Sequence, residues 1–271
     1  MQKTAREPLP GRDGWERLPP QFGEEIGHRA SIGLLALSTD RAGAFDTEEF
    51  LRAKGVAMFS TRIPMAPVAT PETLAAMAVH LSDATRLLVP GSRLDVVGFS
   101  CTSGTVAIGI ARVHEAIRAA RPGVRVTTPI EAGYEALRRL GAERITLVVP
   151  YLVKTAELVS GFFEQKGIEI LRRATFELDG DPDMNRLSPQ ALIEAAIATD
   201  TRDSQAVFIS CTGLRTAPVI SVLEQRLGKP VVTSNQALAW HALRLAGITD
   251  RFEARGLLFA MEQASGSAPR Y

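Results

Sequence analysis

The chain has 271 residues, of which 45% are hydrophobic and 23% are charged, and its formal net charge at pH 7 is +1. This length exceeds what one small core needs and fits two compact lobes. Because acidic and basic residues are balanced and no apolar run approaches the roughly 18 residues that span a bilayer, the sequence predicts neither nucleic-acid binding nor a membrane span.

The N-terminal 25 residues lack the apolar segment of an export signal. The whole chain contains two cysteines, which cannot build a disulfide framework. We therefore expect a cytoplasmic protein. Residues 1–27 are predicted to form an N-terminal extension to the fold.

Apolar runs that suit strands buried on both faces recur along the chain, and helical patterns lie between them. The predicted strands cover residues 31–38, 56–63, 94–100, 145–150, 168–176, 206–210 and 230–233. The predicted helices cover residues 70–89, 105–121, 129–141, 156–167, 189–200 and 234–247. Alternation of this kind predicts an α/β fold with parallel sheets.

The order of these elements repeats. A strand ends at Ser38 and a cysteine follows at Cys101, and a second strand ends near Tyr151 with a cysteine following at Cys211. This layout predicts two pseudo-symmetric, Rossmann-like lobes, each with a four-stranded parallel sheet flanked by helices. The first lobe comprises residues 28–126 with 234–271, and the second comprises 127–233. The helix at 234–247 is expected to pack back on the first lobe.

The cysteines occur in similar settings, "VGFSCTSGT" and "VFISCTGLRT", each after a predicted strand and before a predicted helix. Ligands bind at the carboxyl ends of strands in such sheets, so two facing lobes would place Cys101 and Cys211 on opposite sides of one small molecule. A helix N-terminus after each cysteine would favour a thiolate. One thiolate opposite one thiol can remove a proton from one face of a carbon and return another to the opposite face.

Short polar residues surround both cysteines. Thr102, Ser103, Thr212 and Gly213 can bind carboxylate oxygens through hydroxyl or backbone N–H groups, and can stabilise an enediolate. The alternatives are a buried cysteine that acts as a small hydrophobic residue, and a two-lobed small-molecule binding or sensor protein without catalysis. Neither nucleotide-binding nor metal-ligand spacing is found, so no metal is expected.

Several segments resemble the aspartate/glutamate racemase superfamily. "GFSCTSGTVAIG", "SCTGLRT", "TTPIEAGYEALRRLGAERITLVVPY" and "SNQALAW" are similar to its branch of maleate isomerases, arylmalonate decarboxylases and ectoine-utilization proteins. "IGLLALSTD", "TRIPMAPVATPETL" and "CTSGT" look closest to the ectoine-utilization members. The resemblance spans about residues 30–250. It implies an enzyme that uses no cofactor and has its active site between two lobes.

The resemblance also implies roles for individual residues. Cys101 and Cys211 match the catalytic pair, which exchanges protons in racemases, whereas the first cysteine attacks the alkene carbon in maleate isomerases. The hydroxyl residues Ser38 and Thr39, together with Tyr151 and Asn185, match substrate-binding positions.

Asp40 departs from the pattern, because maleate isomerases have an asparagine shortly after the first strand. Asp40 either receives a substrate ammonium group or caps a helix. The main hypothesis is therefore a racemase or isomerase of a small carboxylate or amino acid, of the ectoine-utilization kind. The alternative is a maleate cis-trans isomerase that acts by covalent cysteine attack. The resemblance also suggests a homodimer.

Overall fold

Two four-stranded parallel sheets organise the chain in the computed structural model, which describes residues 9–10 and 15–262. The first sheet has the order β4-β3-β5-β6 and the second has the order β10-β9-β7-β8. The first contains β3 (Ala30–Leu37), β4 (Val56–Ile63), β5 (Val96–Phe99) and β6 (Arg125–Thr127). The second contains β7 (Arg144–Tyr151), β8 (Glu169–Leu178), β9 (Ala206–Ile209) and β10 (Val231–Thr233). The predicted fold class is confirmed.

The two sheets follow the same plan when β3 is matched with β7. In each sheet the first strand lies between the second and the third, and the fourth strand pairs with the third. All eight residues of β3 are buried, which explains why an uninterrupted apolar run marks it in the sequence. The strand β6 was not predicted, because it has only three residues and one of them is exposed.

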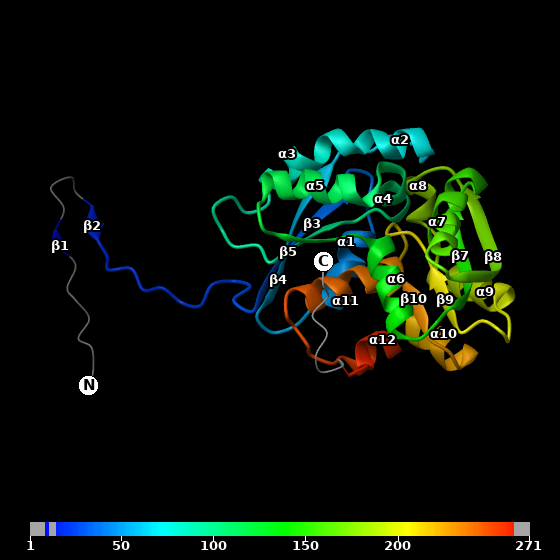
Figure 1. Ribbon diagram of the computed structural model, residues 1–271. Coiled ribbons are helices and arrows are strands. Elements are labelled where there is room, and N and C mark those ends of the chain that lie inside the picture. The colour runs from blue at the N-terminus through cyan, green and yellow to red at the C-terminus, as the bar shows by residue number, and fades with distance from the viewer. Residues whose placement is uncertain (1–8, 11–14, 263–271) are drawn as a thin grey trace.

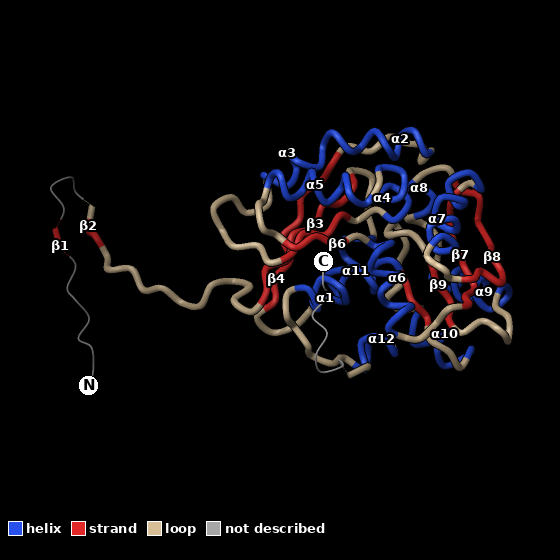
Figure 2. Tube along the Cα trace, viewed as in Figure 1, coloured by secondary structure: helices blue, strands red, loops and turns tan. Residues whose placement is uncertain are grey.

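Helices cover both faces of each sheet (Figure 2). Those of the first half are α1 (Gly43–Leu51), α2 (Pro71–Ala76), the 3₁₀ helix η1 (Met77–His80), α3 (Leu81–Arg86), α4 (Thr102–Ile108), α5 (Ile110–Ala120) and α6 (Pro129–Arg139). Those of the second half are α7 (Val153–Gln165), α8 (Asp181–Met184), α9 (Pro189–Thr199), α10 (Ile220–Leu227), α11 (Ser234–Leu245), η2 (Glu253–Arg255) and α12 (Leu257–Ala260). None of the described helices has the length and apolarity needed to cross a bilayer.

Two predicted helices are divided. The segment 70–89 forms α2, η1 and α3, and the segment 105–121 is interrupted at Gly109, whose φ of 92° lies in the left-handed region. The short antiparallel pair β1 (Leu9–Pro10) and β2 (Glu16–Arg17) lies away from the sheets, and an extended segment after β2 joins it to the main body (Figure 1). The rest of the predicted N-terminal extension, and residues 263–271 of the predicted first lobe, lie outside the described residues. The division into lobes stays a prediction.

The two halves exchange a helix. The helix α6 follows β6 of the first sheet but packs on the second, where a Cβ at Gly133 would lie 2.6 Å from the Phe208 ring. The helix α11 follows β10 of the second sheet but packs on β5 and β6 of the first. There Leu238 lies 3.3 Å from the Cβ position of Gly98, and Thr127 Oγ1 lies 2.8 Å from His241 Nδ1.

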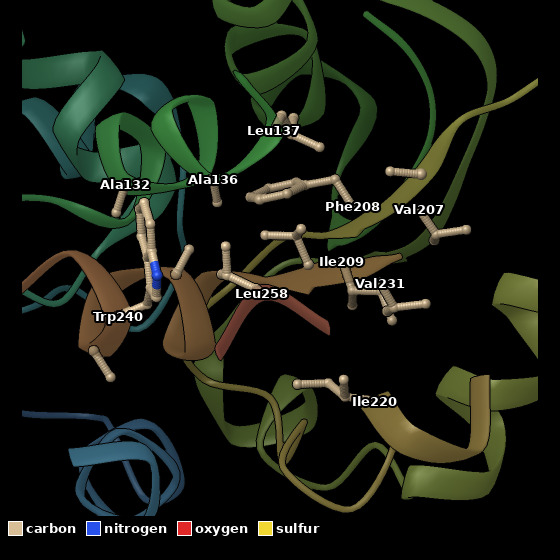
Figure 3. Close-up of a cluster of buried hydrophobic side chains, with 14 of the residues drawn as sticks. Ala132, Ala136, Leu137, Val207, Phe208, Ile209, Ile220, Val231, Trp240 and Leu258 are labelled. Carbon is tan, nitrogen blue, oxygen red and sulfur yellow. The ribbon is translucent and has the colours of Figure 1, made fainter. Parts of the chain in front are cut away.

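The exchanged helices join the hydrophobic cores of the two halves. One cluster of buried side chains includes Ile32 and Val96 of the first sheet together with Phe208 and Val231 of the second. Figure 3 shows Leu137 of α6 above Phe208 of β9, Ala136 beside the Phe208 ring, and Ala132 next to Trp240 of α11. This shared core holds the two sheets together. The carboxyl ends of their strands meet at the site described next.

Candidate active site

A small cavity lies beyond the carboxyl ends of β3, β5, β7 and β9, where the two sheets meet. Its volume is about 10 Å³, which is room for about one water molecule. The polar residues that line it are Cys101, Thr102, Ser103, Tyr151, Asp181, Cys211 and Thr212. The apolar residues that line it are Leu37, Met65, Ala69, Leu74 and Met184. The fold thus brings both cysteines, 110 residues apart in sequence, to one cavity.

Cys101 is the N-cap residue of α4. Its Sγ accepts a hydrogen bond from the backbone N–H of Gly104 at 3.3 Å, as a capping side chain does. Position 104 needs glycine, because a Cβ there would lie 2.7 Å from that Sγ and 2.6 Å from Met77 Cε. The predicted helix directly after Cys101 is therefore present.

Cys211 is held differently. No helix follows it directly, since α10 begins only at Ile220, so the expected helix N-terminus after this cysteine is wrong. Its φ of 108° is a left-handed conformation that costs a non-glycine residue about 1–3 kcal/mol. Its Sγ accepts from the N–H of Gly213 at 3.3 Å, and its own N–H donates to Ser234 Oγ at 3.0 Å.

A buried carboxylate explains why residues 212–219 form turns instead of a helix. Asp46, on α1, accepts hydrogen bonds from the N–H groups of Thr216 and Ala217 at 2.9–3.1 Å and from Thr216 Oγ1 at 2.6 Å. It also accepts from Asn235 Nδ2 at 3.0 Å. These bonds take the backbone donors that a helix would otherwise use, and they fix the loop that carries Cys211.

Both thiols are free and buried, with 5% of each residue exposed. Burial raises the pKa of Cys101 to about 12 and raises the pKa of Cys211 as well, and Asp181 adds to both shifts when its carboxyl is ionised. A helix N-terminus contributes only about 0.3–1 kcal/mol toward a thiolate. Burial thus opposes the thiolate that the sequence predicts, and it does so at both cysteines.

The hydroxyl groups of the cavity connect the two halves. Thr102 Oγ1 lies 2.8 Å from Ser234 Oγ, and Thr212 Oγ1 donates to the Ser100 carbonyl at 2.9 Å. Tyr151 Oη lies 3.3 Å from Ser210 Oγ, and burial raises the pKa of Tyr151 far above its usual value. Tyr151 is thus a neutral hydroxyl that can donate to an oxygen of a bound molecule.

The remaining predicted site residues, Ser38, Thr39, Asp40, Asn185 and Gly213, lie near the cavity but do not line it. Ser38 Oγ accepts from the N–H of Met65 at 3.0 Å, and Thr39 Oγ1 donates to Asp181 Oδ2. Asn185 Nδ2 donates to the Thr39 carbonyl at 3.2 Å. Gly213 contributes its N–H to Cys211.

Asp40 acts as a helix cap. Its Oδ1 accepts from the N–H groups of Ala42 and Gly43 at 3.0 and 2.7 Å, and its Oδ2 accepts from Ala44 at 2.9 Å, at the start of α1. These hydrogen bonds support the second of the two alternatives for Asp40, a helix cap.

Sequence reasoning missed Asp181, whose carboxyl lines the cavity and is the only one to do so among the described residues. It is the first residue of α8, in the segment "DGDPDMN". The signal that could have marked a close approach is Gly180, because a Cβ there would collide with the Pro67 carbonyl oxygen. Among the described residues, no group of three or more His, Cys, Asp or Glu could hold a metal ion.

Comparison with known proteins shows what this geometry resembles. The family model described as arylmalonate decarboxylase matches residues 109–259, which is more than half of the chain. A maleate isomerase of Pseudomonas putida is 26% identical over 227 residues, covering 81% of this chain and 90% of the relative. The arylmalonate decarboxylase of Bordetella bronchiseptica is 32% identical over 127 residues, covering 46% of this chain and 53% of the relative.

Solved structures agree on the fold. The maleate isomerase Iso of Pseudomonas putida S16 aligns with a TM-score of 0.79 at 22% identity, covering 85% of this chain and 98% of that one. A mutant of arylmalonate decarboxylase aligns with a TM-score of 0.74 at 26% identity, covering 85% and 98%. The chain is therefore an enzyme of the arylmalonate decarboxylase family, in the branch of the aspartate/glutamate racemase superfamily that its cysteine motifs resemble.

Proposed function

We propose that this enzyme is an isomerase of a small carboxylate that needs no cofactor, and that cis-trans isomerisation of maleate is its reaction. The observation that carries the proposal is that Cys101 and Cys211 line one cavity together with the hydroxyl groups of Thr102, Tyr151 and Thr212. The maleate isomerase relatives support this reaction over racemisation of the ectoine-utilization kind, which the sequence alone favoured.

The hydroxyl groups of Thr102 and Tyr151 would donate to one carboxylate of the substrate, whereas the Thr212 hydroxyl already donates to the Ser100 carbonyl. Neutral donors suit this task, since they bind carboxylate oxygens and also stabilise the negative charge that develops on them during reaction. Tyr151 remains protonated because burial raises its pKa, and Thr102 and Thr212 are held in place by Ser234 and the Ser100 carbonyl.

The two thiols would then perform a reversible addition. The sulfur of Cys101 bonds to one alkene carbon, and the π electrons move toward the adjacent carboxylate. The other alkene carbon takes a proton from the Cys211 thiol, and Cys211 is reprotonated by the proton that the Cys101 thiol gives up. The net result is addition of one S–H group across the double bond. Rotation about the resulting single bond and reversal of the same steps release fumarate. One solved structure of a Nocardia farcinica maleate isomerase is described as holding a covalently bound succinylcysteine intermediate, which supports this route.

The experiment is to incubate the protein and its Cys101→Ser and Cys211→Ser variants with maleate and to follow fumarate by proton NMR. We expect fumarate from the unmodified protein only, and a succinyl adduct on Cys101 in the Cys211→Ser variant by mass spectrometry. Unmodified protein that forms neither fumarate nor the adduct would refute the proposal.

Proton transfer at a single carbon is the second candidate. The presence of a thiol from each half in one cavity favours it, because a racemase needs an acid and a base on opposite faces of that carbon. Solvent deuterium entering Cα of an amino acid at the rate of racemisation would identify this reaction. A non-catalytic binding protein is the remaining alternative, and it would show ligand-dependent protection of both thiols from alkylation without any turnover.

The assembly and location of the enzyme complete the proposal: a homodimer in the cytoplasm. The family resemblance supports the dimer, and large apolar side chains are exposed on the segment before β3, among them Trp15 and Phe22 with 76% and 92% exposure. Light scattering coupled to size-exclusion chromatography measures the mass, and a monomer at working concentration would contradict the dimer.

A further inference from the structure

The cavity contains one carboxyl group and no basic side chain. Of the described residues that line it, Asp181 alone carries an ordinary acidic group, and none is Lys, Arg or His. A substrate with two carboxylates therefore meets no fixed positive charge at the lining, and it meets a carboxyl at one end. If the substrate places a carboxylate beside Asp181, the two groups repel each other unless Asp181 is protonated.

One oxygen of the Asp181 carboxyl is held by a hydrogen bond and the other is not. Asp181 is 9% exposed, and its Oδ2 accepts the hydrogen bond from Thr39 Oγ1. The other oxygen, Oδ1, lies 3.7 Å from the Cβ position of Gly213, and Cys211 Sγ lies 3.5 Å from that same position. Oδ1 and Cys211 Sγ thus both border the space next to Gly213, as does Asn185 Oδ1 at 3.4 Å.

Asp181 forms no ion pair within the part of the chain that the structure describes. The titratable groups that face it are the carboxylate of Asp40 after β3, Cys101 after β5 and Cys211 after β9. Burial raises the pKa of Asp181 and Asp40 adds to the shift, whereas the hydrogen bond from Thr39 opposes it. None of these neighbours is a cation that would hold the carboxylate form, and the negative charge of Asp40 favours the protonated acid.

We propose that Asp181 is the specificity-determining residue of this site and acts as a neutral carboxylic acid: its Oδ1–H donates to the second carboxylate of the substrate while Thr39 holds its Oδ2. This inference rests on the proposed function, because it supplies the binding group for the distal carboxylate of a dicarboxylate such as maleate. It predicts a preference for dicarboxylates over monocarboxylates of the same length.

Binding measurements separate this inference from turnover. Succinate serves as the dicarboxylate probe and butyrate as the matched monocarboxylate, and calorimetry gives their dissociation constants at pH 8, where both carboxylates of succinate are ionised. The unmodified protein is expected to bind succinate at least tenfold more tightly than butyrate. Asp181→Leu is expected to lose this preference while keeping its affinity for butyrate.

The Asp181→Asn variant tests whether the side chain at position 181 acts as a hydrogen-bond donor or as an anion. Its amide donates a hydrogen bond at every pH, so this variant is expected to bind succinate at least as tightly as the unmodified protein at pH 8. Binding of succinate that falls tenfold or more in Asp181→Asn would overturn the inference, because an ionised carboxylate would then be required. Equal succinate and butyrate affinities in the unmodified protein would overturn it too. Absence of fumarate formation with the succinate preference intact would refute the proposed reaction and leave the role of Asp181 standing.

Discussion

Ser234 joins the two cysteine-bearing loops, and its removal tests whether that connection sets the geometry of the site. It is the first residue of α11 and is fully buried. Its Oγ accepts the N–H of Cys211 at 3.0 Å and shares a hydrogen bond of 2.8 Å with Thr102 Oγ1. The change Ser234→Ala leaves the buried N–H of Cys211 without this acceptor.

The size of the effect follows from these contacts. A buried donor left unsatisfied costs about 1–3 kcal/mol, and 1.4 kcal/mol corresponds to a tenfold change in an equilibrium constant. Cys211 has a left-handed backbone that persists only while its surroundings hold it, so we expect the loop to relax when the bond is lost. Ser234→Ala should therefore lower the free energy of unfolding by about 1–3 kcal/mol and lower kcat by at least tenfold.

The assay is urea denaturation for stability and a direct turnover measurement for kcat. Ser188→Ala is the matched control, because Ser188 caps α9 through a 3.1 Å bond from Ala191 N–H and does not line the cavity. Losing this cap should cost about 1 kcal/mol of stability with kcat unchanged. The reasoning fails if Ser234→Ala and Ser188→Ala have the same kcat relative to that of the unmodified protein. It also fails if Ser234→Ala is as stable as the unmodified protein.

Three further predictions concern titratable groups. Cys101→Ser and Cys211→Ser should each lower turnover by several orders of magnitude with an unchanged circular dichroism spectrum, and near-normal turnover in either would contradict a paired mechanism. Because burial raises the pKa of Cys101 to about 12, its alkylation rate by iodoacetamide should keep rising tenfold per pH unit beyond pH 9, where an ordinary thiol levels off. Burial lowers the pKa of His241 from 6.5 to about 4, so the unfolded chain binds the proton first and stability falls as the pH drops below 6.5. Between pH 7 and pH 5 this loss is about 2 kcal/mol, and a His241→Gln variant measured by urea denaturation should lack it.

The two sheets could be predicted because their central strands β3 and β7 are buried along almost their whole length, whereas the edge strands β4 and β8 are partly exposed. The predicted strand 56–63 coincides with β4, and the other predicted strands differ from the structure by one or two residues at an end. Continuous apolar runs give this signal without any knowledge of tertiary contacts. The helix boundary at Gly109 was not predicted, because the helical pattern of apolar residues continues on both sides of it.

The site residues could be predicted only where the neighbouring sequence indicates their role. Each cysteine follows an apolar strand, and that pattern predicted their common cavity. The turn after Cys211 depends on Asp46, which lies 170 residues from Thr216 in sequence, so nothing local indicates it. Asp181 lies in a segment that reads as a solvated turn, and it is buried because Gly180 packs against the Pro67 carbonyl from the other half.

The exchange of α6 and α11 between the two halves determines whether either half can fold alone. Residues 28–126 expressed alone would leave the face of β5 and β6 bare where Leu238 now lies, and residues 127–233 would lack the α11 neighbour of α6. The arrangement is that of a swapped dimer whose two half-length subunits have been joined into a single polypeptide. Neither half is thus a self-sufficient folding unit, and the two should melt together in one transition.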